Sequence, residues 1–439
     1  MRRRDFLSLA AAAVPARLAR AAQAGAGVDG ARLRRRLERL STFGREAGGT
    51  FASGVSRVAY SDADLLARTW LLAEIHGAGF TPRLDAAGNI FARTGGADPS
   101  RPPILFGSHI DSVPGGGNFD GDLGTLAALE VLQATAAGGT RHPLEMVVWA
   151  HEESTAFGKG TACSRIVAGD LKAGDLDQEW NGLTRRDALT RIGGDPARIE
   201  EAVRPRGAWR AYVELHIEQG ATLDRAQVPI GVVEGIVAIH RYDVVVEGFA
   251  NHAGTTEMDR RQDALVAASR VVLAVRELAA ARAGRQVGTV GRLDVEPNSP
   301  NVVPGRVRLS VEFRDLSAAV LDELGLALRA RLQAIERETS TAISVTLATT
   351  NPPAPAHPGV MSAIGAAADR AGLAARRLSS GAGHDAQMIA ALCPMGMIFV
   401  PSIGGISHSP RELTSWDDCA HGAGVLLGAV LELDRRDSV

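Results

Sequence analysis

Short apolar runs alternate with Ala- and Leu-rich stretches in the first half of the chain. Residues 102–108 and 144–150 have the pattern of buried strands. Residues 121–137, between them, lack proline and end before two glycines, which predicts a helix. A further apolar run at 211–215 repeats the strand signal. Because strand–helix–strand order is what crossover connections require, we expect an α/β fold with a mixed, largely parallel sheet.

The pattern changes after Gly235 to a different order of elements, βαββαβ. The predicted elements are a strand at 242–247, a helix at 260–283, strands at 287–295 and 307–313, a helix at 317–336 and a strand at 342–348. The two middle strands alternate partly between apolar and polar residues, which is typical of antiparallel strands with one solvated face. We therefore expect an inserted α+β domain of ferredoxin-like order. The proline-rich segment 351–355 is predicted to be a linker.

The length of 439 residues also favours more than one domain, because single cores stop growing near roughly 250–300 residues. We expect a catalytic domain at 28–236 and 352–439, interrupted by the inserted domain at 237–351. A composition of 45% apolar and 22% charged residues is typical of a soluble globular protein. The net charge of −2, with arginines spread along the chain, gives no basic stripe for nucleic acid, so no nucleic-acid partner is expected.

The first 24 residues have the pattern of an export signal. Arg3-Arg4-Asp5-Phe6-Leu7 precedes an Ala run, and Ala22-Gln23-Ala24 offers a small-residue cleavage site. The apolar stretch is too short for a stable membrane span, which needs about 20 apolar residues. We expect a twin-arginine signal at 1–24 and a periplasmic enzyme. A frayed basic terminus or a retained anchor is the alternative.

Residues with metal-binding chemistry gather where predicted strands give way to loops, the place where open α/β sheets bind ligands. The first such loop contains His109, a candidate ligand, and Asp111, which could accept the second imidazole N–H. Asp120 follows at a glycine-lined bend, and its two carboxylate oxygens suit a bridge between two cations. Taken alone, a His-x-Asp pair is more often a surface hydrogen bond.

Two adjacent glutamates, Glu152 and Glu153, follow the second predicted strand. Successive side chains on an extended backbone point in opposite directions, so one can bind metal while the other acts as a general base. A solvated Glu–Glu pair is the plain alternative. Thr155 stands where a His-Glu-x-x-His helix would need its second histidine, which disfavours that type of single-zinc protease.

Two further histidines, His216 in segment 214–220 and His408 in segment 407–412, complete the candidate ligands. Together with the carboxylates they suit zinc or a related borderline divalent ion. The three cysteines of the chain cannot supply a Cys₄ structural zinc site.

These segments resemble the zinc-dependent amidase, hydantoinase and carbamoylase branch of the aminoacylase/carboxypeptidase-like metallopeptidase clan. The resemblance runs from about Arg32 to near the C-terminus. It is carried by Gly107-Ser108-His109-Ile110-Asp111, Asp120-Gly121, Glu152-Glu153, His216-Ile217-Glu218-Gln219-Gly220, Asn251-His252-Ala253-Gly254-Thr255-Thr256 and Ser407-His408. It implies a catalytic domain with an inserted lid that also forms the dimer interface, so we expect a homodimer.

The resemblance implies a role for each matching residue. It places two Zn²⁺ ions, or Mn²⁺, Co²⁺ or Ni²⁺ in their place, in each subunit. One ion is held by His109, Asp120 and His216, and the other by Asp120, Glu153 and His408. Glu152 becomes the general base, and His252 resembles a lid residue that reaches the partner's active site and polarises the scissile carbonyl. The implied substrate-binding residues are Gln219, Asn301, Arg314, Gly383 and His384.

The reaction implied is hydrolysis of a linear ureido or amide C–N bond in a small carboxylate-bearing substrate, such as an N-carbamoyl-L-amino acid, β-ureidopropionate or allantoate. Peptidase relatives usually carry an acidic ligand at the position of His216, which argues against peptide cleavage. The alternatives are an aminoacylase or dipeptidase of the same clan and a non-catalytic exported metal- or ligand-binding protein. Glu257, where relatives commonly have proline, is expected to alter a turn near His252.

Overall fold

The computed structural model describes residues 27–172 and 174–439, so the predicted export signal lies outside the described residues and stays a prediction. The chain divides into two compact units. The first unit contains the chain up to residue 233 together with 356–378 and 384–439, and the second contains 234–355 and the short return segment 379–383. The sequence shows no signal for that return segment.

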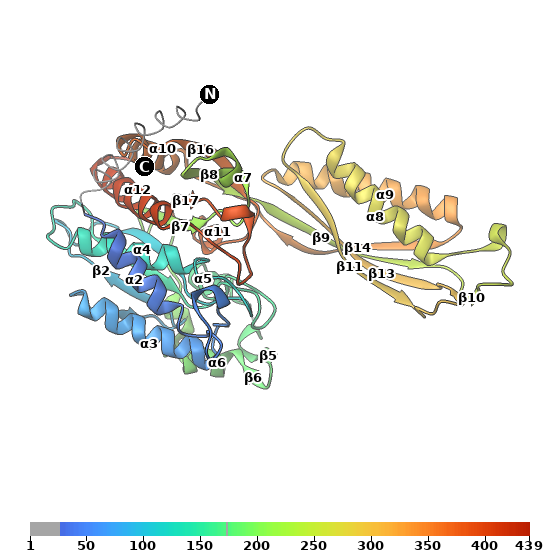
Figure 1. The fold of residues 1–439 in the computed structure, drawn as a ribbon, viewed down its shortest axis with the longest axis horizontal. Coiled ribbons are helices and arrows are strands. Elements are labelled where there is room, and N and C mark those ends of the chain that lie inside the picture. The colour runs from blue at the N-terminus through green and yellow to red at the C-terminus, as the bar shows by residue number, and fades with distance from the viewer. Residues whose placement is uncertain (1–26, 173) are drawn as a thin grey trace, which may run out of the picture. The chain divides into compact units, whose positions relative to one another are not determined.

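A mixed sheet forms the centre of the first unit, with the strand order β1-β2-β4-β3-β7-β17-β8 (Figure 1). Its strands are β1 (Arg83–Leu84), β2 (Ile90–Arg93), β3 (Ile104–His109), β4 (Leu144–Trp149), β7 (Ala211–Ile217), β8 (Ile230–Ile236) and β17 (Met395–Val400), with β15 (Ala354–Pro355) and β16 (Ala375–Ser380) paired to β8. The four central strands are parallel, and the flanking pairs are antiparallel. The expected largely parallel sheet is thereby confirmed.

The helices of the first unit cover the sheet and its loops. They are α2 (Gly30–Leu40), α3 (Asp62–Gly77), α4 (Asp122–Ala134), α5 (Ala162–Val167), α6 (Arg185–Arg191), α7 (Thr222–Ala226), α10 (Pro358–Arg370), α11 (Asp385–Ile389) and α12 (Trp416–Arg435). Four of them, α2, α4, α10 and α12, pack together in one layer against the sheet. The remaining elements are short: η2 (Phe51–Ser53), η3 (Asp175–Asp177), η4 (Pro196–Ala202), η6 (Ile403–Gly405) and the hairpin strands β5 (Glu179–Trp180) and β6 (Leu183–Thr184).

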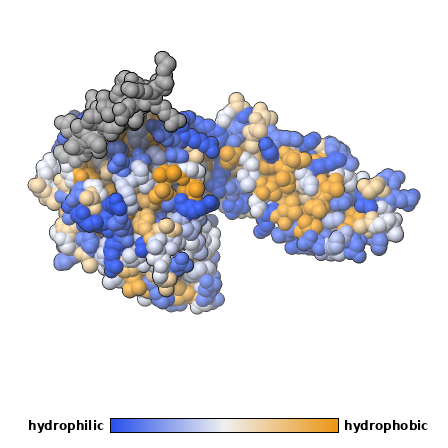
Figure 2. Space-filling view, viewed as in Figure 1, coloured by the Kyte–Doolittle hydropathy of each residue, from blue (hydrophilic) through white to orange (hydrophobic). Residues whose placement is uncertain are grey.

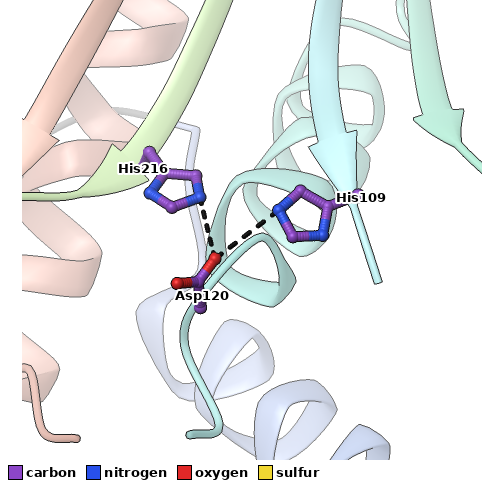
Figure 3. Close-up of side chains that lie close together, drawn as sticks. All are labelled: His109, Asp120 and His216. Carbon is purple, nitrogen blue, oxygen red and sulfur yellow. Dashed lines mark ion pairs between the residues drawn. The ribbon is translucent and has the colours of Figure 1, made fainter. Parts of the chain in front are cut away.

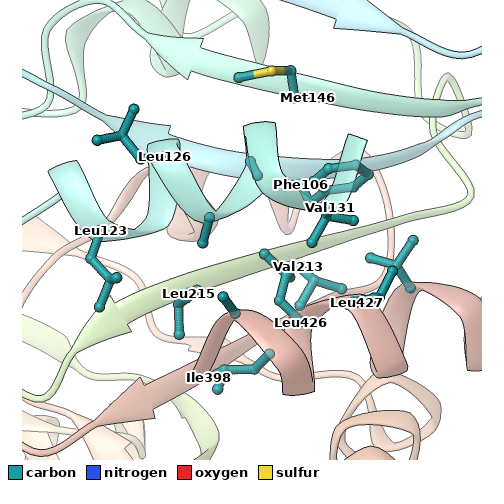
Figure 4. Packing of buried hydrophobic residues seen from close by; sticks show 14 of the residues in the cluster. Phe106, Leu123, Leu126, Val131, Met146, Val213, Leu215, Ile398, Leu426 and Leu427 are labelled. Atoms are coloured by element: carbon teal, nitrogen blue, oxygen red, sulfur yellow. The ribbon is translucent and has the colours of Figure 1, made fainter. Parts of the chain in front are cut away.

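The core between this helix layer and the sheet follows from the alternation of side chains along each strand. Val213 and Leu215, two positions apart on β7, both face the helices, where they pack with Leu126 of α4 and Leu426 of α12 (Figure 4). All four side chains are fully buried. Burial of one such side chain stabilises the fold by about 1.5–3 kcal/mol. Because Val213 and Leu215 lie on the strand that carries His216, their burial also fixes the position of that candidate ligand.

The second unit has the predicted βαββαβ order. Its elements are β9 (Ala238–Glu247), α8 (Ala264–Ala280), β11 (Val287–Glu296), β13 (Arg306–Asp315), α9 (Ala318–Thr339) and β14 (Ala342–Asn351), with the small strands β10 (Asn251–His252) and β12 (Val302–Val303) and the turn η5 (Met258–Arg260). The four long strands form an antiparallel sheet in the order β11-β13-β9-β14. One face of this sheet packs against α8 and α9.

Two predicted boundaries in the second unit were wrong. The helix predicted at 260–283 starts at Ala264, because the Asp263 side chain accepts the N–H groups of Leu265 and Val266 as an N-cap. The predicted linker at 351–355 overlaps β14, which pairs with β9 as far as Asn351, and the next two-residue strand pairs with β8. Within the described residues, no helix is long and apolar enough to cross a membrane.

Candidate metal centre

Three side chains from different elements converge at the ends of the central strands (Figure 3). His109 ends β3, His216 lies near the end of β7, and Asp120 directly precedes the turn into α4. The Oδ1 atom of Asp120 lies 3.2 Å from Nε2 of His216 and 3.5 Å from Nε2 of His109. Gly121 allows this approach, because its φ is +68° and a Cβ there would lie 2.4 Å from the His109 ring.

The other oxygen of Asp120 faces a second group. Its Oδ2 atom lies 3.4 Å from Nε2 of His408, and the same nitrogen lies 3.4 Å from Oε1 of Glu153. Asp120 and Glu153 are buried, whereas the His408 side chain is half-exposed. The structure therefore brings together all five predicted ligands as two groups that share Asp120.

The spacing within each group fits a divalent ion. Two ligand atoms at about 2.1 Å from a tetrahedral zinc ion would lie about 3.4 Å apart. The four contacts between nitrogen and carboxylate oxygen in the two groups measure 3.2, 3.4, 3.4 and 3.5 Å. Imidazole nitrogen and carboxylate oxygen are also the donors that zinc and its neighbours accept.

The orientation of the two buried imidazoles leaves Nε2 available in each. The Nδ1 atom of His216 lies 3.0 Å from the carbonyl oxygen of Ile217, and Nδ1 of His109 lies 3.0 Å from that of Asp111. Because a carbonyl only accepts hydrogen bonds, Nδ1 carries the proton and Nε2 keeps its lone pair. The Gly121 N–H, which donates to Nε2 of His216 at 3.2 Å, agrees with this assignment.

Asp111 contacts more than the imidazole predicted for it. Its carboxylate lies 3.5 Å from Nδ1 of His109, a longer distance than that to its own backbone carbonyl. The same carboxylate accepts the backbone N–H groups of Glu152 at 3.1 Å and of Glu153 at 3.0 Å. The Asp111 carboxylate thus holds the main chain of both glutamates and also lies beside the imidazole ring of His109.

The glutamates take different positions. Glu153 belongs to the second ligand group, whereas Oε2 of Glu152 lies 4.0 Å from Nε2 of His109 and belongs to neither group. The carbonyl of Glu152 accepts the Thr161 N–H at 2.6 Å, so the main chain is held on both sides. Glu152 is therefore placed beside the first group without completing it.

Burial and mutual charge shift the protonation of the cluster. Burial raises the pKa of Glu153 to about 7, and the charge of Asp120 raises it as well. Burial also raises the pKa of Glu152 well above its usual range. For Asp120, burial acts to raise the pKa, but the facing histidines, His216 above all, outweigh it when they are protonated and hold the pKa well below the ordinary value. Carboxylates grouped in this way form a site that favours a multivalent cation.

Two predicted substrate-binding residues lie beside the ligands. Gln219, in the left-handed region at φ +59°, donates from its amide nitrogen to Oδ2 of Asp120 at 2.7 Å. His384 is buried, and its ring stands edge-on to that of His216 with 4.6 Å between the ring centroids. Gly383 directly precedes His384 in the chain. Gln219 thus contacts the shared ligand itself.

The other predicted residues belong to the second unit. His252 is exposed on β10, and the Ala253 N–H donates to the carbonyl of Asn301 at 2.9 Å, so these two segments are joined. Nδ1 of His252 accepts the Gly254 N–H at 3.0 Å. The neutral ring therefore carries its proton on Nε2, which is a hydrogen-bond donor.

The Arg314 side chain, on β13 of the second unit, forms two hydrogen bonds with neighbouring residues. Its Nε donates to Glu312 at 2.7 Å, and its Nη1 donates to the carbonyl of Gly381 at 2.6 Å. The pocket beside it holds about 600 Å³ and is lined by Arg241, Thr289, Arg292, Glu312, Arg314 and Gly381 among others. Glu257 has a φ of −58°, a value that proline also adopts, so the backbone at this position is compatible with either residue.

Comparison with known proteins identifies the family of the chain. The model of Peptidase family M20/M25/M40 matches residues 105–432. The chain belongs to this family. The family resemblance inferred from the motifs is thereby confirmed.

Individual relatives of this M20/M25/M40 chain cover almost its whole length. An N-carbamoyl-L-amino acid amidohydrolase of Geobacillus stearothermophilus is 38% identical over 92% of this chain and 99% of that protein. An allantoate amidohydrolase of Escherichia coli is 35% identical, over 88% of this chain and 94% of that protein. The crystal structure of an amidase of the hydantoinase/carbamoylase family from Burkholderia multivorans superposes with a TM-score of 0.86 at 36% identity, covering 94% of this chain and 99% of that one.

The sequence analysis of this M20/M25/M40 chain missed two buried carboxylates. Glu214 forms a third group with His216 and His384, and it accepts from the Ser108 hydroxyl at 2.8 Å. Its position two residues before His216 on one strand was the available signal, because such residues share a face. Glu412 lies in the segment of His408, and the sequence contains no signal for its contacts.

Proposed function

We propose that this chain is a metal-dependent hydrolase of a linear ureido or amide C–N bond in a small carboxylate-bearing substrate. The observation that carries the proposal is the division of Asp120, whose Oδ1 faces His109 and His216 and whose Oδ2 faces His408. A carboxylate shared in this way suits two cations. The named activities of the relatives, on an N-carbamoyl amino acid and on allantoate, support the substrate class.

The two ligand groups would hold one divalent ion each, zinc or a related metal. Such ions lower the pKa of a water molecule and polarise a carbonyl oxygen when they are bound. Glu152 is assigned as the general base, because it lies beside the first group and is not needed to complete either. Its carboxylate takes the proton of the attacking water and returns it to the departing nitrogen.

The second unit carries the other groups assigned to the substrate, His252, Asn301 and Arg314, in addition to Gln219 and His384 beside the ligands. We assign His252 to the scissile carbonyl in the active site of the partner subunit, and its Nε2 proton is the donor that a developing oxyanion requires. Arg314 and Asn301 are assigned to the substrate carboxylate. Two of the five Arg314 N–H donors are used by Glu312 and Gly381, which leaves one on Nη1 and both on Nη2 for the carboxylate.

Ammonia release measures this activity directly. The purified protein is expected to release ammonia from N-carbamoyl-L-amino acids or allantoate, to lose that activity with a chelator and to regain it when Zn²⁺, Mn²⁺ or Co²⁺ is added. Dipeptides are expected to remain intact, and a ninhydrin assay of the same samples checks this. Cleavage of dipeptides alone would replace the proposal with a peptidase, and tight metal binding without any turnover would indicate a binding protein.

We further propose that the second unit mediates a homodimer. Three large apolar side chains on its helices are exposed: Val266 by 48% and Leu273 by 60% on α8, and Leu326 by 70% on α9. Val266 and Leu273 are seven residues apart and so share a helix face. Apolar surface gathers over these helices (Figure 2), and such patches on soluble proteins often mark an interface.

Light scattering behind a sizing column tests the dimer. The protein is expected at twice its chain mass of 46.0 kDa, and Leu273→Glu combined with Leu326→Glu is expected to give the single-chain mass, because buried charges disrupt an interface. Leu66→Glu on α3 is the matched control, since Leu66 is also 60% exposed but belongs to the first unit. A monomeric wild-type protein, or a double variant that stays dimeric, contradicts the proposal.

A further inference from the structure

Glu412 is a buried carboxylate that the proposed reaction does not use. Only 3% of its surface is exposed, although it lies in a loop between η6 and α12. Its Oε1 atom accepts the backbone N–H groups of Phe119 at 2.9 Å and of Asp120 at 3.1 Å. Its Oε2 atom accepts the hydroxyl of Ser407 at 2.8 Å. One side chain thus joins the loop of Asp120 to the loop of His408.

The loop around His408 is held by this connection and by the Ser407 hydroxyl, whose oxygen also lies 3.0 Å from Oδ2 of Asp120. His408 has a φ of +52°, in the left-handed region, and its side chain is 48% exposed. A non-glycine residue in that region costs roughly 1–3 kcal/mol and persists only where surrounding contacts hold it. Ser407, the preceding residue, is held by Glu412, and the Glu412 N–H closes the turn on the carbonyl of Ser409 at 3.0 Å.

The loop of Asp120 has additional support. The Asp120 carbonyl accepts the Asp122 N–H at 2.8 Å where α4 begins, and the Phe119 carbonyl accepts the Leu123 N–H at 3.0 Å. The first turn of a packed helix therefore holds Asp120 even without Glu412. Loss of Glu412 would consequently disturb the His408 side of the centre more than the His109 side.

The shape of the facing loop is adapted to Glu412. A Cβ at Gly117 would lie 2.0 Å from Oε1 of Glu412 and 2.5 Å from its Cβ. Both distances are far below van der Waals contact, and the second involves an atom close to the main chain, so rotation of the carboxylate cannot relieve it. Residue 117 thus has room for hydrogen alone while Glu412 is in place.

We infer that Glu412 is a positioning residue that assembles the second metal group by fastening the His408 loop to the Asp120 loop. The inference rests on the proposed function, because it assigns one ion to each group. Its hydrogen bonds act on the second group of Asp120, Glu153 and His408, whereas the first group contains no residue of the His408 loop. The two ions should therefore respond differently when Glu412 is replaced.

Zinc titration of the full-length protein against a chromophoric chelator tests this inference. The wild-type chain is expected to bind two ions. Glu412→Ala should keep one ion at wild-type affinity and bind the other about 10- to 100-fold more weakly, the usual loss when a residue supporting a metal ligand is removed. Gly117→Ala should have the same effect, because its methyl group displaces Glu412 without altering that residue's chemistry.

Glu412→Gln distinguishes positioning by hydrogen bonds from a requirement for charge. The amide oxygen can still accept both backbone N–H groups, and the amide nitrogen can donate to Ser407, so both ions should bind as in the wild type. Glu145→Ala is the control for general destabilisation. Glu145 is buried and accepts from the Trp209 indole at 2.9 Å, but it lies at the opposite end of β4 from the ligands.

Four outcomes contradict the inference. If Glu412→Ala binds both ions normally and only lowers the melting temperature, it behaves as the Glu145→Ala control should. Glu412 would then have a structural role alone. Equal weakening of both ions would show that the residue supports the whole centre. Glu412→Gln that weakens binding as much as Glu412→Ala would show that charge decides the effect. A wild-type chain that binds fewer than two ions would remove the two-ion proposal together with this inference.

Discussion

Replacement of Glu152 by glutamine is expected to lower kcat by about 10²–10⁴-fold, the usual contribution of a general base, while metal content stays unchanged. Glutamine has nearly the same shape but cannot take a proton from water. Glu152 belongs to neither ligand group, and its Oε2 atom lies 4.0 Å from Nε2 of His109. The measurement is steady-state turnover of an N-carbamoyl amino acid or allantoate together with the zinc content of the dialysed protein.

The neighbouring substitution is the matched control. Glu153→Gln makes the same chemical change one residue further on, in a side chain whose Oε1 lies 3.4 Å from Nε2 of His408. It is expected to weaken binding of one ion, because an amide is a poorer ligand than a carboxylate. Glu152→Gln should therefore lower turnover without changing metal content, whereas Glu153→Gln should lower the metal content. Metal loss in Glu152→Gln would identify Glu152 as a ligand, and the roles of the pair would be exchanged.

The order of elements could be predicted for the buried strands β3, β4 and β7, which are largely apolar runs, and for strands with one solvated face. Along β9, Tyr242, Val244 and Val246 are buried, while Asp243 and Glu247 are exposed. The alternation of apolar and polar residues in the sequence therefore matches the alternation of buried and exposed side chains. The start of α8 was missed although Asp263 precedes the apolar run, which is a usual capping signal. The β14 boundary was missed because pairing with β9 continues through a register shift between Leu347 and Thr349.

Three of the five candidate ligands, His109, Glu153 and His216, could be predicted because parallel strands end at the same edge of a sheet, whereas the family resemblance was needed to complete the set with Asp120 and His408. β3 and β7 pair in parallel and carry His109 and His216 to that edge. The contacts of Glu412 could not be predicted in this way. Glu412 and Phe119 are 293 positions apart, and neither lies in a periodic element that would direct one toward the other. Hydrogen bonds between loops depend on the finished fold.

The same limit applies to the orientation of Asp120. The sequence suggested a bridging carboxylate, but the direction of each oxygen is set by the loop that precedes α4. The backbone N–H groups of Phe119 and Asp120 are held by Glu412, and the absence of a side chain at Gly121 lets the His109 ring approach. Each of these contacts comes from a different part of the chain.

Replacement of Asp120 by asparagine is expected to have the largest effect of any single change in the centre. The amide keeps the size of the side chain, but one oxygen becomes an NH₂ group that donates hydrogen bonds and cannot bind a cation. Asp120 is the one residue that the two ligand groups share, with Oδ1 facing His216 at 3.2 Å and Oδ2 facing His408 at 3.4 Å. Whichever way the amide turns, one group loses its shared ligand, and both lose the negative charge.

We therefore expect Asp120→Asn to bind fewer than one zinc ion per chain after dialysis. Loss of the metals removes several kcal/mol of transition-state stabilisation, which corresponds to a fall in kcat of about 10³–10⁵-fold. Metal analysis and turnover of the same preparation provide the measurement.

Asp434→Asn is the control, because Asp434 is also buried and its carboxylate accepts the N–H groups of Arg141 and His142 at 2.9 and 2.8 Å near the end of α12. That variant should lose stability but keep both ions. If Asp120→Asn instead retains two tightly bound ions, the carboxylate does not bridge the groups, and each ion must be held by its remaining ligands alone.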